Sequence, residues 1–236
     1  LPAISRLKIG TMKLGEEKRG VRLGEGVLGV ALWHWQDLKV QEIYVTVYAK
    51  HKELILLLDK FGFECYGEKK NGEKVYAKNR KNVDVTDPYK SFPFISGDFE
   101  RAGILAIRGD FHDLIFPYSE LRGVKQNFEE VVAGNGITKA YIAFPQGEVS
   151  YREGCPVFIY RQAKDGEGTK RYKSCITSVG TVTKISVIKN RGVALESLED
   201  FVRQAGNKTI FKESELEDWH KNKKNLVVIE LVYNKA

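Results

Sequence analysis

The sequence of 236 residues predicts an α/β domain followed by a mostly-β domain. Two observations support this prediction. Residues 4–78 alternate strand-like and helix-like patterns and end in a hairpin signal. Residues 103–233 instead contain short strands separated by turns, with a few short helical segments between them. The first pattern is typical of a sheet covered by helices, and the second is typical of a compact barrel with helices packed outside.

A linker is expected between the two domains. Residues 81–88 include Asp87 and Pro88 and have the composition of a loop. We therefore expect a first domain at residues 1–80 and a second domain at residues 89–236. Each is long enough to bury a hydrophobic core of its own.

The composition is that of a soluble globular protein, with 42% hydrophobic and 29% charged residues. No run approaches the ~18 apolar residues of a membrane-spanning helix, and the first 30 residues lack the layout of a secretory signal. We therefore expect a cytoplasmic protein that does not enter a membrane. The cysteines are dispersed, which favours buried free thiols and no metal site. They are Cys65, Cys155 and Cys175.

The most informative stretch lies in the first domain. An alternating strand at residues 4–9 leads through a polar loop to Gly24 and Gly26, which precede an apolar-periodic helix at residues 28–38. Glycines at a helix start allow a tight turn and a close approach of the backbone, and the helix N-terminus favours an anion such as a pyrophosphate. A tight loop without a ligand would have the same sequence.

The elements that follow complete an α/β pattern. A β-branched and aromatic strand at residues 40–48 is expected to run parallel to the first strand, and a helix at residues 51–60 to end at Gly62 in a left-handed cap. A hairpin is expected across Asn71 and Gly72.

This succession resembles the GNAT superfamily of acetyl-CoA-dependent N-acetyltransferases over residues 4–78. The motif that carries the resemblance is Gln/Arg-x-x-Gly-x-Gly/Ala, read here as Val21-Arg22-Leu23-Gly24-Glu25-Gly26 with Val21 in the first position. The resemblance implies a site for acetyl-CoA or another acyl-CoA. The residues expected to hold the coenzyme are Leu7, Lys8 and Ile9 beside the pantetheine arm and Arg22, Leu23, Gly24, Glu25, Gly26 and Val27 around the pyrophosphate.

Two features depart from the GNAT pattern. The tyrosine that serves many members as general acid falls at Leu58, and a common asparagine falls at Lys52. Leucine cannot donate a proton, so the acid would have to be Tyr48 or water, and His51 is the candidate base. The family fold also begins with strands upstream of the central one, and we expect this chain to be the rear part of a longer protein.

The second domain is expected to form a barrel from strands at residues 103–108, 138–144, 155–161, 174–182 and 226–233. Helices are expected at residues 111–115, 195–204 and 213–221. The order resembles a PUA-like domain of the ASCH or EVE kind. The segments that carry this resemblance are Gly109 to Pro117, Gly154 to Arg161 and Ser174 to Val182.

The PUA-like resemblance implies binding of RNA or of a modified base. Residues 161–191 contain eight Lys or Arg and two acidic residues, in a chain of net charge +7, which suits an anionic partner. Aromatic and basic side chains that alternate can stack on bases and neutralise phosphates, although the tyrosines could equally be core residues. The residues expected to bind nucleic acid are Tyr160, Arg161, Lys170, Arg171, Tyr172 and Lys173.

We therefore expect part of an acyl-CoA-dependent N-acetyltransferase joined to a PUA-like domain that binds nucleic acid, with RNA favoured. The alternative is a non-catalytic RNA- or DNA-binding module whose GNAT-like half is a scaffold. The substitution at the general-acid position favours this alternative.

Overall fold

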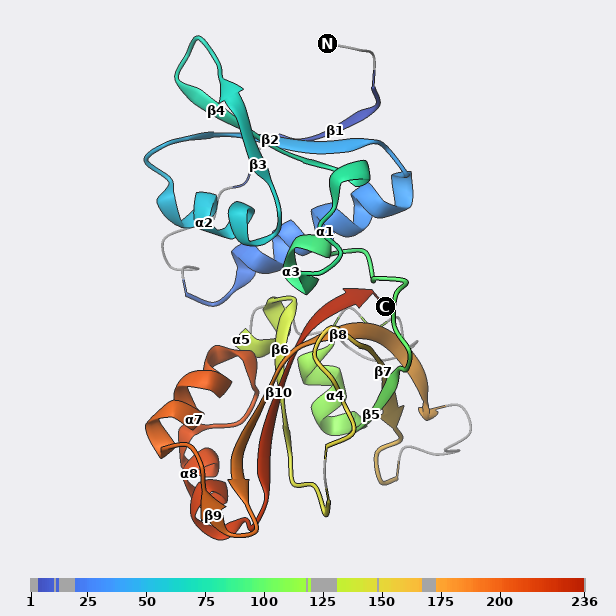
Figure 1. Ribbon diagram of the computed structural model, residues 1–236, viewed down its shortest axis with the longest axis vertical. Coiled ribbons are helices and arrows are strands. Elements are labelled where there is room, and N and C mark those ends of the chain that lie inside the picture. The colour runs from blue at the N-terminus through green and yellow to red at the C-terminus, as the bar shows by residue number, and fades with distance from the viewer. Residues whose placement is uncertain are drawn as a thin grey trace. The chain divides into compact units, whose positions relative to one another are not determined.

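The computed structural model describes residues 4–10, 12, 20–117, 119, 131–147, 149–166 and 173–235 (Figure 1). The chain is a mixed α/β protein with two sheets, and it divides into two compact units, Leu1–Gly97 and Asp98–Ala236. Each unit has its own sheet and its own hydrophobic core.

The first unit contains a four-stranded sheet in the order β1-β2-β4-β3. β1 and β2 are parallel, and the remaining neighbours are antiparallel. Parallel strands need a crossover connection, which α1 supplies between β1 and β2. The elements are β1 (Arg6–Ile9), α1 (Leu23–Leu38), β2 (Glu42–Tyr48), α2 (Lys52–Lys60), β3 (Glu64–Glu68) and β4 (Glu73–Asn79).

α1 begins five residues earlier than the apolar pattern indicates. Leu28, Leu32 and Trp35 lie at three- and four-residue steps and are completely buried, which fixes the face that packs on the sheet. The helix extends back to Leu23 although Gly24 and Gly26 are poor helix formers, and the acidic Glu25 in its first turn, paired with Arg22, favours this start. The predicted start at residue 28 is therefore wrong, and Gly24 lies inside the first helical turn.

The end of α2 is the predicted glycine cap. Gly62 has a φ of +75°, and its N–H donates to the carbonyl of Asp59 at 3.0 Å, while the N–H of Phe63 donates to Leu58 at 3.0 Å. A side chain at Gly62 would be strained by its backbone conformation, and its Cβ would lie 3.0 Å from the carbonyl oxygen of Lys90. The predicted hairpin across Asn71 and Gly72 also forms, with Gly72 at φ +80°.

The boundary between the units lies at Gly97, later in the chain than the predicted linker at residues 81–88. That stretch forms η2 (Arg80–Asn82) and the N-cap of α3 (Pro88–Ser91). Phe92 follows α3 and is completely buried, with its ring centroid 5.6 Å from that of Phe61. The segment after residue 88 therefore belongs to the core of the first unit.

The second unit contains a curled half-barrel with strands in the order β5-β7-β8-β10-β6, and β9 pairs with β8. β5 and β7 are parallel, and the other pairs are antiparallel. The pairing of β8 with β10 shifts register at three places, and such bulges bend a long strand. The strands are β5 (Gly103–Arg108), β6 (Thr138–Ala143), β7 (Pro156–Gln162), β8 (Cys175–Asn190), β9 (Val193–Ala194) and β10 (Leu226–Lys235).

Most strands of this unit lie close to their predicted bounds, but β8 continues eight residues beyond the predicted end at residue 182. The extension pairs with the start of β10. α7 and α8 pack on this part of the sheet through Phe201, Ala205 and Leu216, which belong to one core cluster with Ile188. The helices are α4 (Gly109–Ile115), α5 (Val132–Asn135), α7 (Leu198–Ala205), η3 (Gly206–Lys208) and α8 (Glu213–Asn222).

No helix in the described part of the chain is both long and apolar enough to span a membrane.

Candidate functional site

The residues expected to hold a coenzyme pyrophosphate lie at the N-terminus of α1. Arg22 precedes the helix with a φ of 61°, and its Nη2 atom lies 3.0 and 3.1 Å from the two carboxylate oxygens of Glu25. The N–H of Gly26 donates to the carbonyl of Arg22 at 3.2 Å and is thus the first to join the helical ladder. The N–H groups before it point out of the helix end and, with the helix dipole, favour an anion. Because Arg22 neutralises Glu25, the acidic residue does not cancel that effect.

The two parallel strands end at the same edge of the sheet. In a strand–helix–strand crossover the helix runs back along the sheet, so the N-terminus of α1 lies toward the carboxyl ends of β1 and β2. Their register runs from Arg6 opposite Glu42 to Ile9 opposite Val45, where the pairing stops. β2 continues to Tyr48 beyond the last residue that pairs with β1. The topology therefore places the N-terminus of α1 and the carboxyl end of β1 toward the same end of this sheet.

The predicted catalytic residues lie at the end of β2 and in the turn that follows it. Tyr48 ends the strand and is 42% exposed, and its carbonyl accepts a hydrogen bond of 3.0 Å from the N–H of His51. His51 is the exposed N-cap residue of α2. Leu58, which stands where the GNAT resemblance implies a general acid, is completely buried in the core. A proton donor cannot come from that position, so Tyr48 remains the candidate acid.

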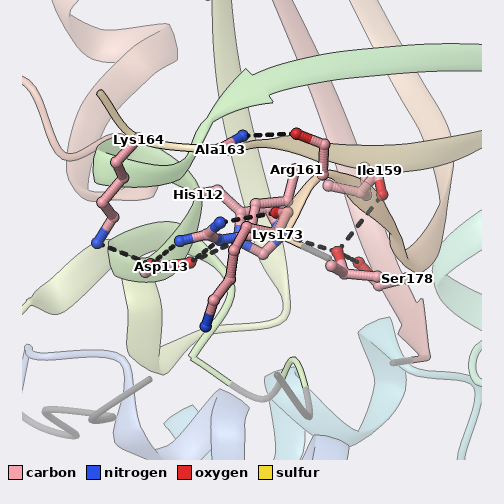
Figure 2. Close-up of polar contacts among 10 residues, drawn as sticks. His112, Asp113, Ile159, Arg161, Ala163, Lys164, Lys173 and Ser178 are labelled. Carbon is pink, nitrogen blue, oxygen red and sulfur yellow. Dashed lines mark hydrogen bonds and ion pairs between the residues drawn. The ribbon is translucent and has the colours of Figure 1, made fainter. Parts of the chain in front are cut away.

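The most tightly organised polar site lies in the second unit, around Arg161 and Asp113 (Figure 2). Nε and Nη2 of Arg161 donate to the two carboxylate oxygens of Asp113 at 2.8 and 2.9 Å, and Nη1 donates to the carbonyl of Lys173 at 2.8 Å. The Arg161 side chain has no solvent exposure, and that of Asp113 is 7% exposed. The bidentate pair ties β7 to α4.

Two further side chains contact the Asp113 carboxylate, of which His112 is buried and Lys164 is 39% exposed. Nζ of Lys164 lies 2.9 Å from Asp113, and Nδ1 of the buried His112 lies 3.0 Å from the same carboxylate. Since a carboxylate only accepts hydrogen bonds, Nδ1 of His112 donates. Its Nε2 lies 2.7 Å from the hydroxyl of Thr177.

The charge of Asp113 follows from these contacts. Burial opposes ionisation of its carboxyl, but the hydrogen bonds from Arg161, His112 and Lys164 outweigh that effect and hold its pKa well below the usual range. The carboxylate therefore stays ionised and balances the buried guanidinium.

A glycine makes room for this centre. A Cβ at Gly109, the first residue of α4, would lie 2.8 Å from Nη2 of Arg161 and 2.9 Å from its Cζ. The absence of a side chain at this position lets the guanidinium reach Asp113.

The predicted nucleic-acid residues do not all have the expected position. Arg161 cannot contact a nucleic acid in this structure, because its side chain is fully buried and serves to hold β7 on α4. Tyr160 is half-buried on the opposite side of the strand, and Lys173 is half-buried while its carbonyl accepts from Arg161. Lys170, Arg171 and Tyr172 lie outside the described residues.

A shallow polar pocket of about 380 Å³ adjoins Tyr160 at the carboxyl ends of β5 and β7. It is lined by Arg108, Tyr160, Gln162, Ala163, Asp165 and Ser174. Sequence reasoning singled out only Tyr160 among these residues. The alternation of β7 could have identified Gln162, which lies two residues further along the strand and so on the same face.

The cysteines are free, but none of them is fully buried as predicted. Cys65 is exposed, and Cys155 and Cys175 are half-buried. Within the described ranges, no group of three or more His, Cys, Asp or Glu residues is placed to hold a metal ion.

The chain matches no protein-family model, no curated protein and no solved structure.

Proposed function

We propose that the first unit binds acetyl-CoA or another acyl-CoA for transfer of the acyl group to an amine, and that the second unit is a PUA-like domain that binds nucleic acid, with RNA favoured. The observation that supports the first part best is the β1–α1–β2 crossover, which directs the α1 N-terminus toward the end of the sheet where β1 and β2 have their carboxyl ends. This arrangement combines an anion-binding helix end with a strand edge that could pair with an amide-containing chain.

The sheet order also agrees with the resemblance to the GNAT superfamily. The central parallel pair is followed by a helix and an antiparallel hairpin whose second strand lies next to β2. β2 extends to Tyr48, past its last pair with β1 at Val45, and in this proposal the acyl-pantetheine arm lies beside Thr46 and Tyr48. An amine aligned there would attack the thioester carbonyl, and positioning would supply most of the rate.

In this proposal Tyr48 protonates the departing thiolate, because its hydroxyl belongs to an exposed side chain at the strand end. His51, three residues further on, would accept a proton from the substrate ammonium, so that the neutral amine can attack the thioester carbonyl.

Calorimetric titration with acetyl-CoA tests the coenzyme site. Gly24→Asp places a carboxylate in the first turn of α1, where it suits the helix dipole and preserves the fold but repels a pyrophosphate. We expect acetyl-CoA binding by the natural chain and a loss of about tenfold or more in the variant. Val30→Glu adds the same charge to an exposed position of the same helix, 46% exposed, and should bind as the natural chain does. Absence of heat from the natural chain would exclude the coenzyme site.

A second function is favoured by one observation. Leu58 is completely buried, so the residue at the position where the resemblance implies a general acid is part of the hydrophobic core. A non-catalytic nucleic-acid-binding protein with a GNAT-like scaffold would tolerate this change. That function predicts that Gly24→Asp alters nothing, while nucleic-acid binding still weakens steeply with salt.

A further inference from the structure

The outer face of β5, β7 and β8 in the second unit exposes several large apolar and aromatic side chains. Burial alternates along β7, where Ile159 and Arg161 point inward and are completely buried. Their neighbours Phe158, Tyr160 and Gln162 point outward. Phe158 is 39% exposed and Tyr160 is half-buried. Two aromatic rings therefore lie two residues apart on one outer strand face.

The neighbouring strands extend this surface. Ile104 of β5 lies opposite Phe158, Ala106 lies opposite Tyr160, and Ile176 of β8 lies opposite Tyr160 on the other side. Ile104 and Ile176 are 58% and 55% exposed. We call the outward-facing residues Ile104, Ala106, Phe158, Tyr160 and Ile176 the platform.

The platform borders polar and positive groups at one end. Tyr160 is shared with the polar pocket, whose lining includes Arg108 and Gln162 on the same outer face. The Arg108 side chain is 60% exposed, and its ion pair of 2.6 Å with Asp110 is also open to solvent. An exposed ion pair contributes little to stability. The Arg108 guanidinium can therefore leave Asp110 and contact a phosphate with little loss of free energy.

Resting on the proposed nucleic-acid function, we propose that the platform binds two adjacent unstacked bases of a single strand, one on Phe158 and one on Tyr160. Arg108 neutralises the phosphate next to the base on Tyr160, and Gln162 hydrogen-bonds to the edge of that base. Every base has a π-face that stacks on an aromatic ring, whereas phosphate contacts require a cation.

The spacing of the rings selects a single strand. Residues two apart on a strand are separated by about 6.6 Å, roughly twice the separation of stacked bases in a duplex. Bases in a duplex also cover each other and cannot present their faces, whereas unpaired bases can splay apart onto a sheet. The occupant is therefore a single-stranded nucleic acid. A protein partner with an apolar surface would not need the polar pocket and the Arg108 cation beside the platform.

The buried centre holds the platform in place. Arg161 lies between Tyr160 and Gln162 on β7 and is fixed from the inner side by Asp113. This bond anchors the strand to α4. The outer rings are therefore already held in position, and binding of a base loses little conformational entropy.

The test is fluorescence anisotropy with a labelled single-stranded oligouridylate of about 12 nucleotides, which suits the usual site sizes of such binders. Phe158→Leu and Tyr160→Leu keep an apolar side chain and remove the π-face. We expect each to weaken binding about tenfold, and Tyr160→Phe to bind within about twofold of the natural chain. Arg108→Gln should lower the slope of binding against salt by about one phosphate contact. The same oligonucleotide in a duplex should bind more weakly than the single strand.

Phe144→Leu is the matched control, because Phe144 lies in the same unit and is also 39% exposed, but away from the platform on the chain segment after β6. It should leave binding unchanged. If the natural chain binds the oligonucleotide and the two leucine variants bind equally well, the platform is wrong while the nucleic-acid function stands. If the natural chain binds no oligonucleotide, the nucleic-acid function itself fails. A change of oligomeric state in the leucine variants would make the face a protein interface and overturn the proposal.

Discussion

Lys78 in the first unit and Arg161 in the second are both deeply buried cations, but they are balanced in different ways. Lys78 in the first unit is 2% exposed, and its Nζ donates to the carbonyls of Phe61, Lys90 and Phe92 at 2.7, 2.7 and 2.5 Å. In the second unit Arg161 is neutralised by a carboxylate.

The difference affects which charges change near neutral pH. Burial lowers the pKa of Lys78 to about 7, and the more distant Asp87 opposes this only in part. A guanidinium cannot lose its proton in a protein, and Asp113 stays ionised. Carbonyl dipoles hold a lysine that titrates in the physiological range, whereas a carboxylate partner fixes the charge of both groups. The Lys78 site is thus sensitive to pH near neutrality, and the Arg161–Asp113 pair is not.

The largest expected effect is in the second unit. Asp113→Asn leaves the Arg161 guanidinium buried without a counter-charge, and we expect the free energy of unfolding to fall by about 3–5 kcal/mol. Local hydrogen exchange of β7 and α4 measures the change for this unit alone. Asp110→Asn, in an exposed pair, should change the stability by no more than about 0.5 kcal/mol. Equal effects of the two variants would show that burial of the pair is unimportant.

The next effect is the pH dependence of the first unit. The pKa of Lys78 is about 7 in the folded chain and 10.5 for an ordinary lysine, so the unfolded chain binds more protons between these values. Stability should therefore rise as the pH increases from about 7, with a slope of at most about 1.4 kcal/mol per pH unit.

Hydrogen exchange of β4 and α3, corrected for the intrinsic pH dependence of exchange, measures this slope. Lys78→Met has no titrating group at this position, so its stability should not rise with pH above about 7. It should also be less stable than the natural chain at high pH, because carbonyls that accept from Lys78 lose their donor. A rise that persists in Lys78→Met would assign the titration to another group.

Gly109→Ala should have a smaller effect, of about 1–3 kcal/mol. Its Cβ would displace the Arg161 guanidinium, which the contacts with Asp113 prevent from moving freely. Thermal unfolding followed by circular dichroism detects the loss. Gly147→Ala, where a Cβ meets no atom within 4 Å, should be neutral or slightly stabilising. If Gly109→Ala left the stability unchanged, the Arg161 guanidinium and Asp113 could shift together without a loss of stability.

The smallest effect is expected for Thr177→Val, at about 1 kcal/mol. This change removes the hydroxyl that faces Nε2 of the buried His112 and leaves the ring nitrogen without that partner. Urea unfolding measures it, and combination with Asp113→Asn in a double-mutant cycle shows whether the centre acts as one network. A coupling energy near zero would separate His112 and Thr177 from the Arg161–Asp113 pair.

Local signals predicted most of the fold. The strand and helix patterns, the left-handed cap at Gly62 and the turn at Gly72 depend on residues close in the chain, and the structure confirms them. The start of α1 and the length of β8 were wrong, because packing extends an element past the point where its periodicity is visible.

The basic side chains were predicted less well. The Lys- and Arg-rich stretch at residues 161–191 suggested a positive surface, yet Arg161 and Lys189 within it are buried. Nζ of Lys189 donates to the carbonyls of His220 and Lys221 at 2.6 and 3.4 Å, at the end of α8. Such lysines satisfy carbonyls that the helix leaves without a donor.

The sequence by itself determined the two-unit α/β organisation, the turns and the presence of glycines at the start of α1, because backbone conformation and side-chain periodicity are local properties. Only the tertiary structure decided what the charged residues do. Arg161 meets Asp113 across 48 positions, and Lys78 meets Phe92 across 14. Whether a cation faces solvent, a carboxylate or a carbonyl depends on which strands and helices become neighbours, and a single sequence contains no short-range signal for that choice.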